Sequence, residues 1–161
     1  MNIFEIIKQQ IKENGLTVAS FDFDRPWGGF FVIDEEQAQL FANVYFEGLN
    51  VEELRVAGKL SPKILLVKPS ARLSWQYHHR RAETWRIIQG PVGIITSQDD
   101  TESSIVRYEE GTTLVLHKGE RHRLIGLNEW SVVAEFWQHT DALNPSDEED
   151  IVRVQDDYSR K

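Results

Sequence analysis

Hydrophobic and polar positions change their spacing along the chain, and the change comes near Lys63. In residues 1–14 the apolar positions Phe4, Ile7 and Ile11 recur every three to four residues between charged and amide side chains. This is the period of an amphipathic helix, and Asn14-Gly15 is a typical helix end. The pattern therefore predicts a helix over residues 1–14.

Three further segments precede Lys63. Residues 18–23 alternate as a short strand does, and residues 25–29 form a turn signal that carries Trp27. Asp34-Glu35-Glu36-Gln37 resembles a capping box and predicts a second helix as far as about Asn43. Residues 48–59 have no clear period.

From Lys63 onward, short runs rich in Val, Ile, Leu, Trp and Tyr alternate with turn signals such as Gly90-Pro91 and Lys118-Gly119. Many short strands at this spacing predict a sandwich or small barrel. A second capping-box pattern at 146–149 predicts a short helix in the tail. We expect a single mostly β domain over 1–161, with an N-terminal elaboration (1–60), a β-barrel (61–140) and a helical tail (141–161).

Composition narrows the function classes. The formal charge of −8 argues against nucleic-acid binding, and the absence of cysteine excludes disulfides and thiolate metal sites. No stretch has the pattern of a signal peptide or membrane span, which predicts a cytoplasmic protein without membrane contact. Six basic residues near the candidate site favour a small anionic substrate: Lys63, Arg72, Arg80, Arg81, Arg121 and Arg123.

Four side chains have the spacing of a metal site. Gln76 and His78 are two apart on an extended run, Glu83 opens the next apolar run, and His122 follows the Lys118-Gly119 turn. Nitrogen and oxygen donors from neighbouring strands suit a divalent ion, most simply zinc, with manganese, iron, cobalt or nickel as alternatives. The competing interpretation is a polar core pair with an exposed second histidine. Four positions in register favour the metal.

These blocks resemble the two cupin motifs, at Gln76, His78, Glu83 and Gly90 and then at Gly111, Gly119 and His122. The run 73–85 is similar to the C-terminal cupin domain of type II phosphomannose isomerases, where glutamine replaces the first histidine and Arg-Ala-Glu follows. Residues 25–28 and 149–160 resemble that domain's entry and exit motifs. The resemblance implies a cupin fold, a double-stranded β-helix with a jelly-roll-like barrel and peripheral N-terminal and C-terminal helices, in a stand-alone form.

The same resemblance implies a metal-dependent aldose–ketose isomerase that interconverts mannose 6-phosphate and fructose 6-phosphate through a cis-enediol. Another sugar or sugar phosphate is an alternative, and so is a non-catalytic metal- and sugar-binding cupin. An oxygen-using cupin is disfavoured, because Gln76 replaces a histidine. The nucleotidyltransferase domain often fused upstream has no counterpart in the sequence, so no sugar-nucleotide synthesis is expected.

The resemblance and the strand alternation also predict catalytic and substrate-binding residues. Arg81 and Lys63 match basic positions of that family, with Arg81 expected in the loop between two strands and Lys63 pointing inward. Glu135 and His139 share one face of a predicted strand with Trp137, which points them into the barrel, and Trp85 and Trp137 are expected in the core or in the wall of the cavity. The proton-transfer group is left open among Glu135, His139, Lys63 and a hydroxide held by the metal. The alternative for Arg81 and Lys63 is a surface ion pair. The alternative for Glu135 and His139 is a buried polar pair or a residue at a strand end. Predicted substrate-binding residues are Arg153, Arg160 and Trp85.

Free strand edges and two aromatic residues expected to face outward, Trp75 and Tyr77, predict a homodimer.

Overall fold

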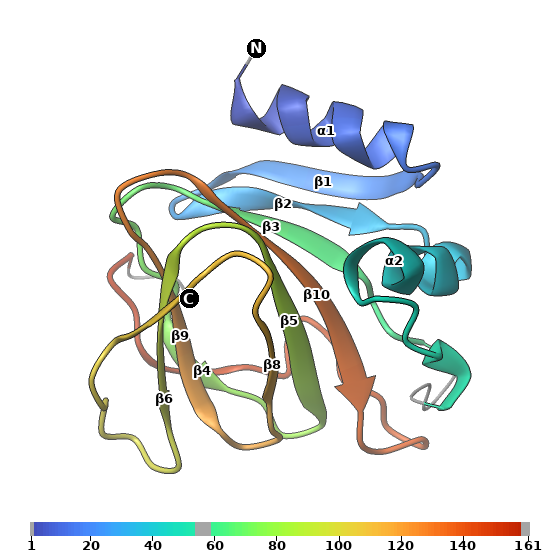
Figure 1. The fold of residues 1–161 in the computed structure, drawn as a ribbon. Helices are drawn as coiled ribbons and strands as arrows, with labels where there is room; N and C mark the ends of the chain where they lie inside the picture. Colours follow the sequence, from blue (N-terminus) through green and yellow to red (C-terminus); the bar gives the residue numbers. More distant parts are fainter. Residues whose placement is uncertain (1, 54–58, 159–161) are drawn as a thin grey trace.

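The computed structural model describes residues 2–53 and 59–158 (Figure 1). Its helical elements are α1 (Ile3–Glu13), η1 (Glu35–Gln37), α2 (Ala38–Tyr45) and η2 (Val51–Glu53). Its strands are β1 (Val18–Arg25), β2 (Gly28–Ile33), β3 (Lys63–Val67), β4 (Trp75–Tyr77), β5 (Arg81–Gln89), β6 (Val92–Ser97), β7 (Val106–Tyr108), β8 (Thr113–Leu116), β9 (Arg121–Gly126), β10 (Ser131–His139) and β11 (Val152–Gln155).

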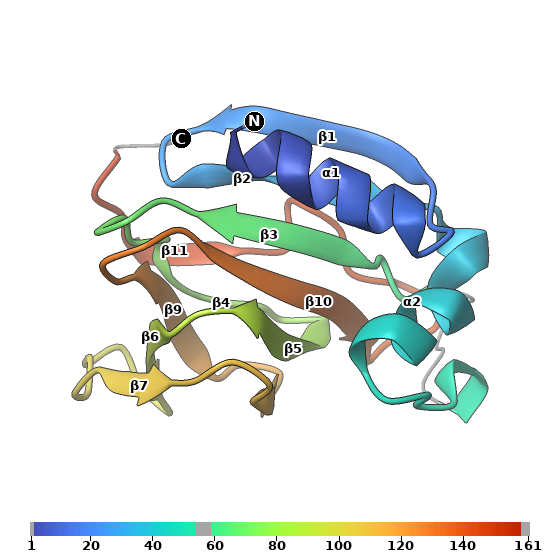
Figure 2. The same cartoon turned by 45° about the horizontal axis from the view of Figure 1, so that its top comes forward.

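The strands form two antiparallel sheets. One has the order β1-β2-β3-β10-β5-β8 and the other β11-β4-β9-β6-β7. Leu65 and Val133 of the first sheet share a buried cluster with Ile94 and Leu124 of the second, so the sheets pack face to face. The predicted mostly β, jelly-roll-like architecture is confirmed (Figures 1 and 2).

The six-stranded sheet is buried on both faces at its centre. In β3, Leu65 points to the second sheet, whereas Ile64 and Leu66 belong to a separate cluster on the outer face. In β10, Val133 and Phe136 divide in the same way. Successive side chains of a strand point to opposite faces of the sheet. Because both faces are buried here, β3 and β10 contain unbroken apolar runs, and both faces need a cover.

Helices supply the outer cover. Figure 2 shows α1 lying along β1 and β2, with α2 beside β10. Ile7 and Ile11 of α1 and Phe41 of α2 are buried in the outer cluster with Phe31 of β2. The N-terminal segment is therefore part of the core. Within the described residues, no helix is long and apolar enough to cross a membrane.

The helix ends follow the sequence signals. The side chain of Asn2 accepts a hydrogen bond from the Glu5 amide at 3.0 Å, which caps α1. Gly15 has a φ of +79°, the left-handed conformation that terminates helices. The Asp34 side chain accepts from the Glu36 amide and starts η1, which continues into α2. Both predicted N-terminal helices are confirmed.

The predicted C-terminal helix is wrong. Within the described part of the tail, residues 145–158, the chain makes turns and then β11, which pairs with β4. The hydroxyl of Ser146 donates to the Asp150 carboxylate at 2.6 Å and accepts from Arg81 at 3.0 Å, instead of capping a helix. Three of the four residues 151–154 are β-branched, a composition that favours a strand, and β11 lies at the edge of its sheet.

The outward orientation predicted for Trp75 is also wrong. Its side chain is 1 % exposed, packs with Ile95 and Ile125, and donates through Nε1 to the Asp100 carbonyl at 2.9 Å. Tyr77 is half-buried, with the Arg121 guanidinium 3.7 Å from its ring centroid. Trp75 therefore gives the predicted homodimer no contact surface and Tyr77 gives only part of its ring, and the dimer stays a prediction.

Two isoleucines of α1 test the role of the helix as a core element. Ile11 is 1 % exposed and Ile6 is 39 % exposed. We expect Ile11→Ala to lower the free energy of unfolding by about 2–5 kcal/mol, because it opens a cavity under the helix. The matched control, Ile6→Ala, should change it by no more than about 0.5 kcal/mol. Urea unfolding measures both, and equal effects would show that α1 does not complete the core.

Candidate metal centre and its cavity

Three predicted ligands converge between the sheets. His78 directly follows β4, Glu83 lies on the inner face of β5, and His122 lies on β9, which pairs with β4. Their side chains are almost fully buried. One potential ligand atom from each residue lies within 4.8 Å of the others, which is close enough for a single ion to contact all three.

Backbone carbonyls set the tautomers of both histidines. His78 Nδ1 lies 2.6 Å from the carbonyl oxygen of Asp150, and His122 Nδ1 lies 3.2 Å from that of Glu120. A carbonyl only accepts, so each Nδ1 carries the proton and each Nε2 presents a lone pair. Metal-binding histidines are commonly oriented by such contacts.

Both lone pairs face the Glu83 carboxylate. His122 Nε2 lies 3.3 Å from Oε1, and His78 Nε2 lies 3.5 Å from Oε2. His122 Nε2 has no hydrogen-bond partner among the described residues. His122 Nε2 is thus an acceptor that faces a carboxylate in a buried site, and it is left unsatisfied unless a cation joins the two groups. The residues present therefore fit a divalent metal.

The charge states agree with this fit. Burial lowers the pKa of His78 to about 4, so its ring is neutral at pH 7 and able to bind a metal. Burial alone would raise the pKa of Glu83, but His78 and the Arg81 guanidinium outweigh it and hold that pKa well below its usual value. Arg81 Nε donates to Glu83 Oε2 at 2.9 Å. The site thus combines one carboxylate with two neutral imidazoles.

Gln76 is the fourth predicted ligand. On β4 it is the register partner of His122 on β9, and it lines the same cavity as Glu83. Its amide is therefore on the correct side of the sheet, and its role as a ligand stays a prediction.

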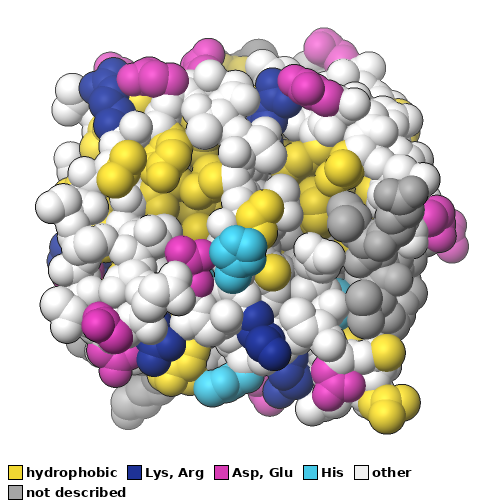
Figure 3. Space-filling model, turned by 60° about the horizontal axis from the view of Figure 1, so that its bottom comes forward, with side chains coloured by type: hydrophobic (Ala, Val, Ile, Leu, Met, Phe, Trp, Pro, Cys, Tyr) yellow, Lys and Arg dark blue, Asp and Glu magenta, His cyan; other side chains and the backbone are white. Residues whose placement is uncertain are grey.

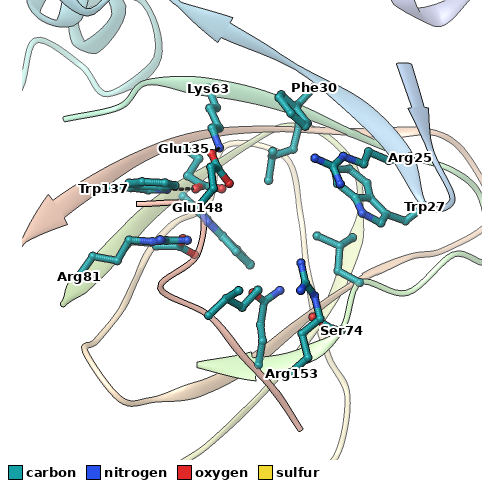
Figure 4. Close-up of a pocket in the computed structure, with 16 residues that line it drawn as sticks. Arg25, Trp27, Phe30, Lys63, Ser74, Arg81, Glu135, Trp137, Glu148 and Arg153 are labelled. Atoms are coloured by element: carbon teal, nitrogen blue, oxygen red, sulfur yellow. Dashed lines mark hydrogen bonds and ion pairs between the residues drawn. The ribbon is translucent and has the colours of Figure 1, made fainter. Parts of the chain in front are cut away.

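A cavity of about 110 Å³ opens beside Glu83 (Figure 4). Lys63, Glu148 and Trp137 lie on one side of this cavity, and Arg25 and Trp27 lie on the opposite side. The cavity lining contains these predicted site residues: Lys63, Gln76, Arg81, Glu83, Trp85, Glu135 and Arg153. The inward orientation predicted for Lys63, Trp85 and Trp137 is confirmed.

Among these lining residues, Glu135 has a strongly raised pKa. Burial, followed by the negative charge of Glu83, raises its pKa to about 8, against the opposing effects of Lys63 and Arg81. Trp137 Nε1 donates to Glu135 Oε1 at 2.5 Å, which fixes the carboxyl group toward the cavity. A carboxyl group with such a pKa can exchange a proton near neutral pH.

His139 is not brought to the cavity. It is 1 % exposed at the end of β10, and its Nδ1 accepts the backbone N–H of Ser146 at 2.9 Å. The residues lining the cavity do not include it. Arg160 lies outside the described residues.

Arg81 lies deeper than expected. The sequence predicted it in a loop, but it opens β5 and is 6 % exposed, with its guanidinium 3.6 Å from the Trp137 ring centroid. Its Nη2 is 3.4 Å from His78 Nε2. Arg81 therefore accompanies the candidate ligands.

Most of the predicted basic cluster is neutralised elsewhere. Four of its members form ion pairs outside the cavity lining: Arg72 with Asp157, Arg80 with Asp147, Arg121 with Asp100 and Arg123 with Glu102. On the face shown in Figure 3, acidic side chains likewise lie close to most of the basic ones. Within this cluster only Lys63 and Arg81 line the cavity.

Sequence reasoning missed Arg25, Phe30 and Glu148 among the lining residues. Arg25 and Phe30 come from the β1–β2 hairpin, and Glu148 comes from the tail. The entry motif at residues 25–28 was a signal for the hairpin. Glu148 had no comparable signal, because its position in a capping-box pattern predicted a helix.

Comparison with known proteins agrees with this geometry. Residues 34–156 match the family described as mannose-6-phosphate isomerase, C-terminal. The xanthan biosynthesis protein XanB of Xanthomonas campestris pv. campestris is 27% identical over 156 residues, covering 96% of this chain and 27% of that protein. The alginate biosynthesis protein AlgA of Pseudomonas aeruginosa is 28% identical, covering 77% of this chain and 24% of that protein. The chain thus spans about a quarter of the length of these curated relatives.

Solved structures share the fold. Oxalate decarboxylase from Bacillus subtilis aligns with a TM-score of 0.57 at 16% identity, covering 83% of this chain and 29% of that one. The capsular polysaccharide assembling protein CapF from Staphylococcus aureus aligns with a TM-score of 0.54 at 13% identity, covering 86% and 34%. The predicted cupin fold is confirmed.

Metal titration tests the ligand group. We expect the metal-stripped protein to bind one zinc ion, and His122→Ala or Glu83→Gln to weaken binding by more than about 100-fold, because loss of an orienting partner alone costs about 10- to 100-fold. His79→Ala removes an exposed histidine next to His78 and should leave the affinity unchanged. Calorimetry reports all four affinities. Equal weakening by His79→Ala would contradict the assignment.

The depressed pKa of His78 gives a pH test on the metal-free protein. Between its ordinary value of 6.5 and about 4, the unfolded state binds a proton at this ring and the folded state does not. The free energy of unfolding should therefore fall as the pH falls through this range, with His78 contributing about 3 kcal/mol. Urea unfolding at several pH values should show a smaller fall for His78→Gln than for wild type. An unchanged fall in this variant would contradict the depressed pKa.

Proposed function

The chain belongs to the mannose-6-phosphate isomerase C-terminal family, and on that premise we propose that it is a metal-dependent aldose–ketose isomerase of a sugar phosphate. The simplest substrate pair is mannose 6-phosphate and fructose 6-phosphate. The observation that carries the proposal is the meeting, in one cavity, of the candidate metal ligand Glu83, the carboxyl group of Glu135 with its raised pKa and the ammonium group of Lys63.

His78, Glu83 and His122, with Gln76 as a fourth ligand, would hold a divalent ion, most simply zinc. When bound, such an ion would polarise the carbonyl and hydroxyl oxygens of the sugar. The ligands need no large rearrangement, because both imidazoles already present Nε2.

Glu135 is the group that we assign to proton transfer. Isomerisation through a cis-enediol moves one proton between C1 and C2 and a second proton between the oxygens O1 and O2. A single base on one face of the sugar suffices for the carbon-bound proton. Among the earlier candidates, His139 lies outside the cavity lining and Lys63 is paired with Glu148. The pKa of Glu135, about 8, matches the exchange of a proton near neutral pH better than an ordinary carboxyl does.

Arg81 stabilises negative charge at the reacting end. Its guanidinium is fixed by Glu83, by the Ser146 hydroxyl and by the Asp147 carbonyl, and it is adjacent to the candidate metal ligands. A rigid cation in a buried site stabilises a developing enediolate without reorganising. Lys63 and Arg153 remain for the anionic part of the substrate, and Trp85 and Trp137 form apolar walls that limit water.

A non-catalytic binding module is the second candidate function. Such a module needs the metal ligands and the cations but has no use for a proton-exchanging carboxyl group. The buried Glu135, oriented by Trp137, therefore favours the enzyme.

An isomerase assay on metal-stripped protein tests the proposal. Protein reloaded separately with zinc, manganese, cobalt or nickel is supplied with mannose 6-phosphate or fructose 6-phosphate. We expect turnover to depend on the added metal and to disappear in His122→Ala. Stoichiometric metal binding without turnover of either sugar would contradict the activity and favour the binding module.

The pH dependence of the reaction tests Glu135. As a base it must be ionised, so kcat/KM should rise with pH through the pKa of Glu135 and then level off. This pKa is about 8 in the metal-free protein, and a metal ion that offsets the charge of Glu83 would lower it. We expect Glu135→Gln to lower kcat by at least about 100-fold, the usual contribution of a positioned base, and to remove this pH limb. Steady-state kinetics from pH 6 to 9 measure both, with metal content as the control. A Glu135→Gln enzyme that keeps the limb would exclude Glu135 as the base.

A further inference from the structure

Lys63 is a buried cation with an exposed partner. It lies on the inner face of β3, where its Nζ is 5.1 Å from the Phe30 ring centroid and 4.7 Å from that of Trp137. Its ammonium group forms an ion pair with the Glu148 carboxylate. The Lys63 side chain is 9% exposed, whereas that of Glu148 is 70% exposed. Loss of the ion pair therefore costs much more free energy for Lys63 than for Glu148.

This difference decides how the pair can open. Glu148 can return to water at little cost, because exposed ion pairs are weak. Lys63 cannot be left alone, because an uncompensated charge in a buried site is strongly unfavourable. The pair therefore separates readily only when another anion takes the place of the Glu148 carboxylate.

The pair also divides two cavities. The cavity beside Glu83 and a second one, of about 340 Å³, share Lys63, Trp137 and Glu148 in their linings. Lys59 lines the second cavity only. Movement of the Glu148 side chain would connect the two, and a ligand could then extend from the metal ligands past Lys63.

The backbone on both sides of Glu148 is fixed. Ser146 is buried and bonded to Arg81, the Asp147 carbonyl accepts from Arg81 at 2.9 Å, and the Asp150 carboxylate accepts from the amides of His79 and Arg80. The side chain of Glu148 is 70 % exposed and can rotate while this backbone stays in place. An exchange of anions at Lys63 therefore needs no movement of the main chain.

We propose that Glu148 is an internal anion that occupies the place of the ligand's anionic group at Lys63 and is exchanged for it on binding. This inference rests on the proposed function for the identity of the ligand, a sugar phosphate. It makes Glu148 a determinant of affinity for anionic ligands and assigns the phosphate subsite to Lys63. Arg25, on the opposite side of the cavity in Figure 4, is the alternative subsite that the test separates.

Calorimetry on the zinc-loaded protein tests the exchange, with inorganic phosphate, mannose 6-phosphate and neutral mannose as probes. Glu148→Gln removes the competing anion, so we expect both anionic probes to bind about three- to tenfold tighter. Mannose should bind equally well to both proteins. Glu149→Gln is the matched control, because it removes the same charge from the neighbouring exposed position without affecting Lys63.

The same comparison in a Lys63→Met protein tests whether the gain in phosphate affinity depends on Lys63. Lys63→Met keeps the length and apolar packing of the side chain against Phe30 and Trp137, and circular dichroism checks that the variant folds. In this background we expect Glu148→Gln to have no effect on phosphate affinity, because the two residues act as one pair. A gain that persists would place the phosphate elsewhere and overturn the proposal. Equal gains from Glu148→Gln and Glu149→Gln in the wild-type background would overturn it as well.

Failure of this inference is distinguishable from failure of the proposed function, because phosphate binding is measured without turnover. A gain in phosphate affinity in a protein that does not isomerise sugars supports the exchange and contradicts the isomerase. Turnover of mannose 6-phosphate with a KM that Glu148→Gln leaves unchanged supports the isomerase and overturns the exchange.

Discussion

The site depends on one electrostatic constraint, the convergence of three acceptor atoms in a buried place. Two imidazole lone pairs and the Glu83 carboxylate face one another at 3.3 and 3.5 Å, and the protein holds both histidines in this orientation through backbone carbonyls. Arg81 balances part of the negative charge at 2.9 Å. Burying these acceptor atoms against one another is unfavourable without a cation. The backbone carbonyls that orient the histidines therefore favour the binding of a divalent ion.

The rest of the architecture keeps that place buried and adds the other ionisable groups of the cavity. Alternation along β3 and β10 directs Lys63, Glu135 and Trp137 inward, while the opposite faces of the same strands are covered by α1 and α2. The tail then crosses the site, where Asp150 orients His78 and Glu148 pairs with Lys63. The outer faces of β3 and β10 therefore pack in the core, whereas their inner faces line the cavity.

Sequence reasoning succeeded where the information was local. The spacing around His78 and His122 predicted that these residues and Glu83 converge, because strand alternation and a turn determine which face such residues occupy. It failed where partners are distant in sequence. Ser146 has the letters of a helix cap, but its hydroxyl bonds to Arg81 and Asp150, and no local pattern encodes that choice. Glu148 was missed for the same reason, since its partner Lys63 lies 85 residues away, on β3.

The central claim is that His78, Glu83 and His122 hold one divalent ion at the end of the substrate cavity. X-ray absorption spectroscopy of the protein loaded with one equivalent of zinc tests it most directly, because outer-shell scattering counts imidazole ligands. The account predicts a nitrogen and oxygen shell with two imidazoles in the wild-type protein and one in His122→Ala. A shell without imidazole, or one that His122→Ala leaves unchanged, would contradict it.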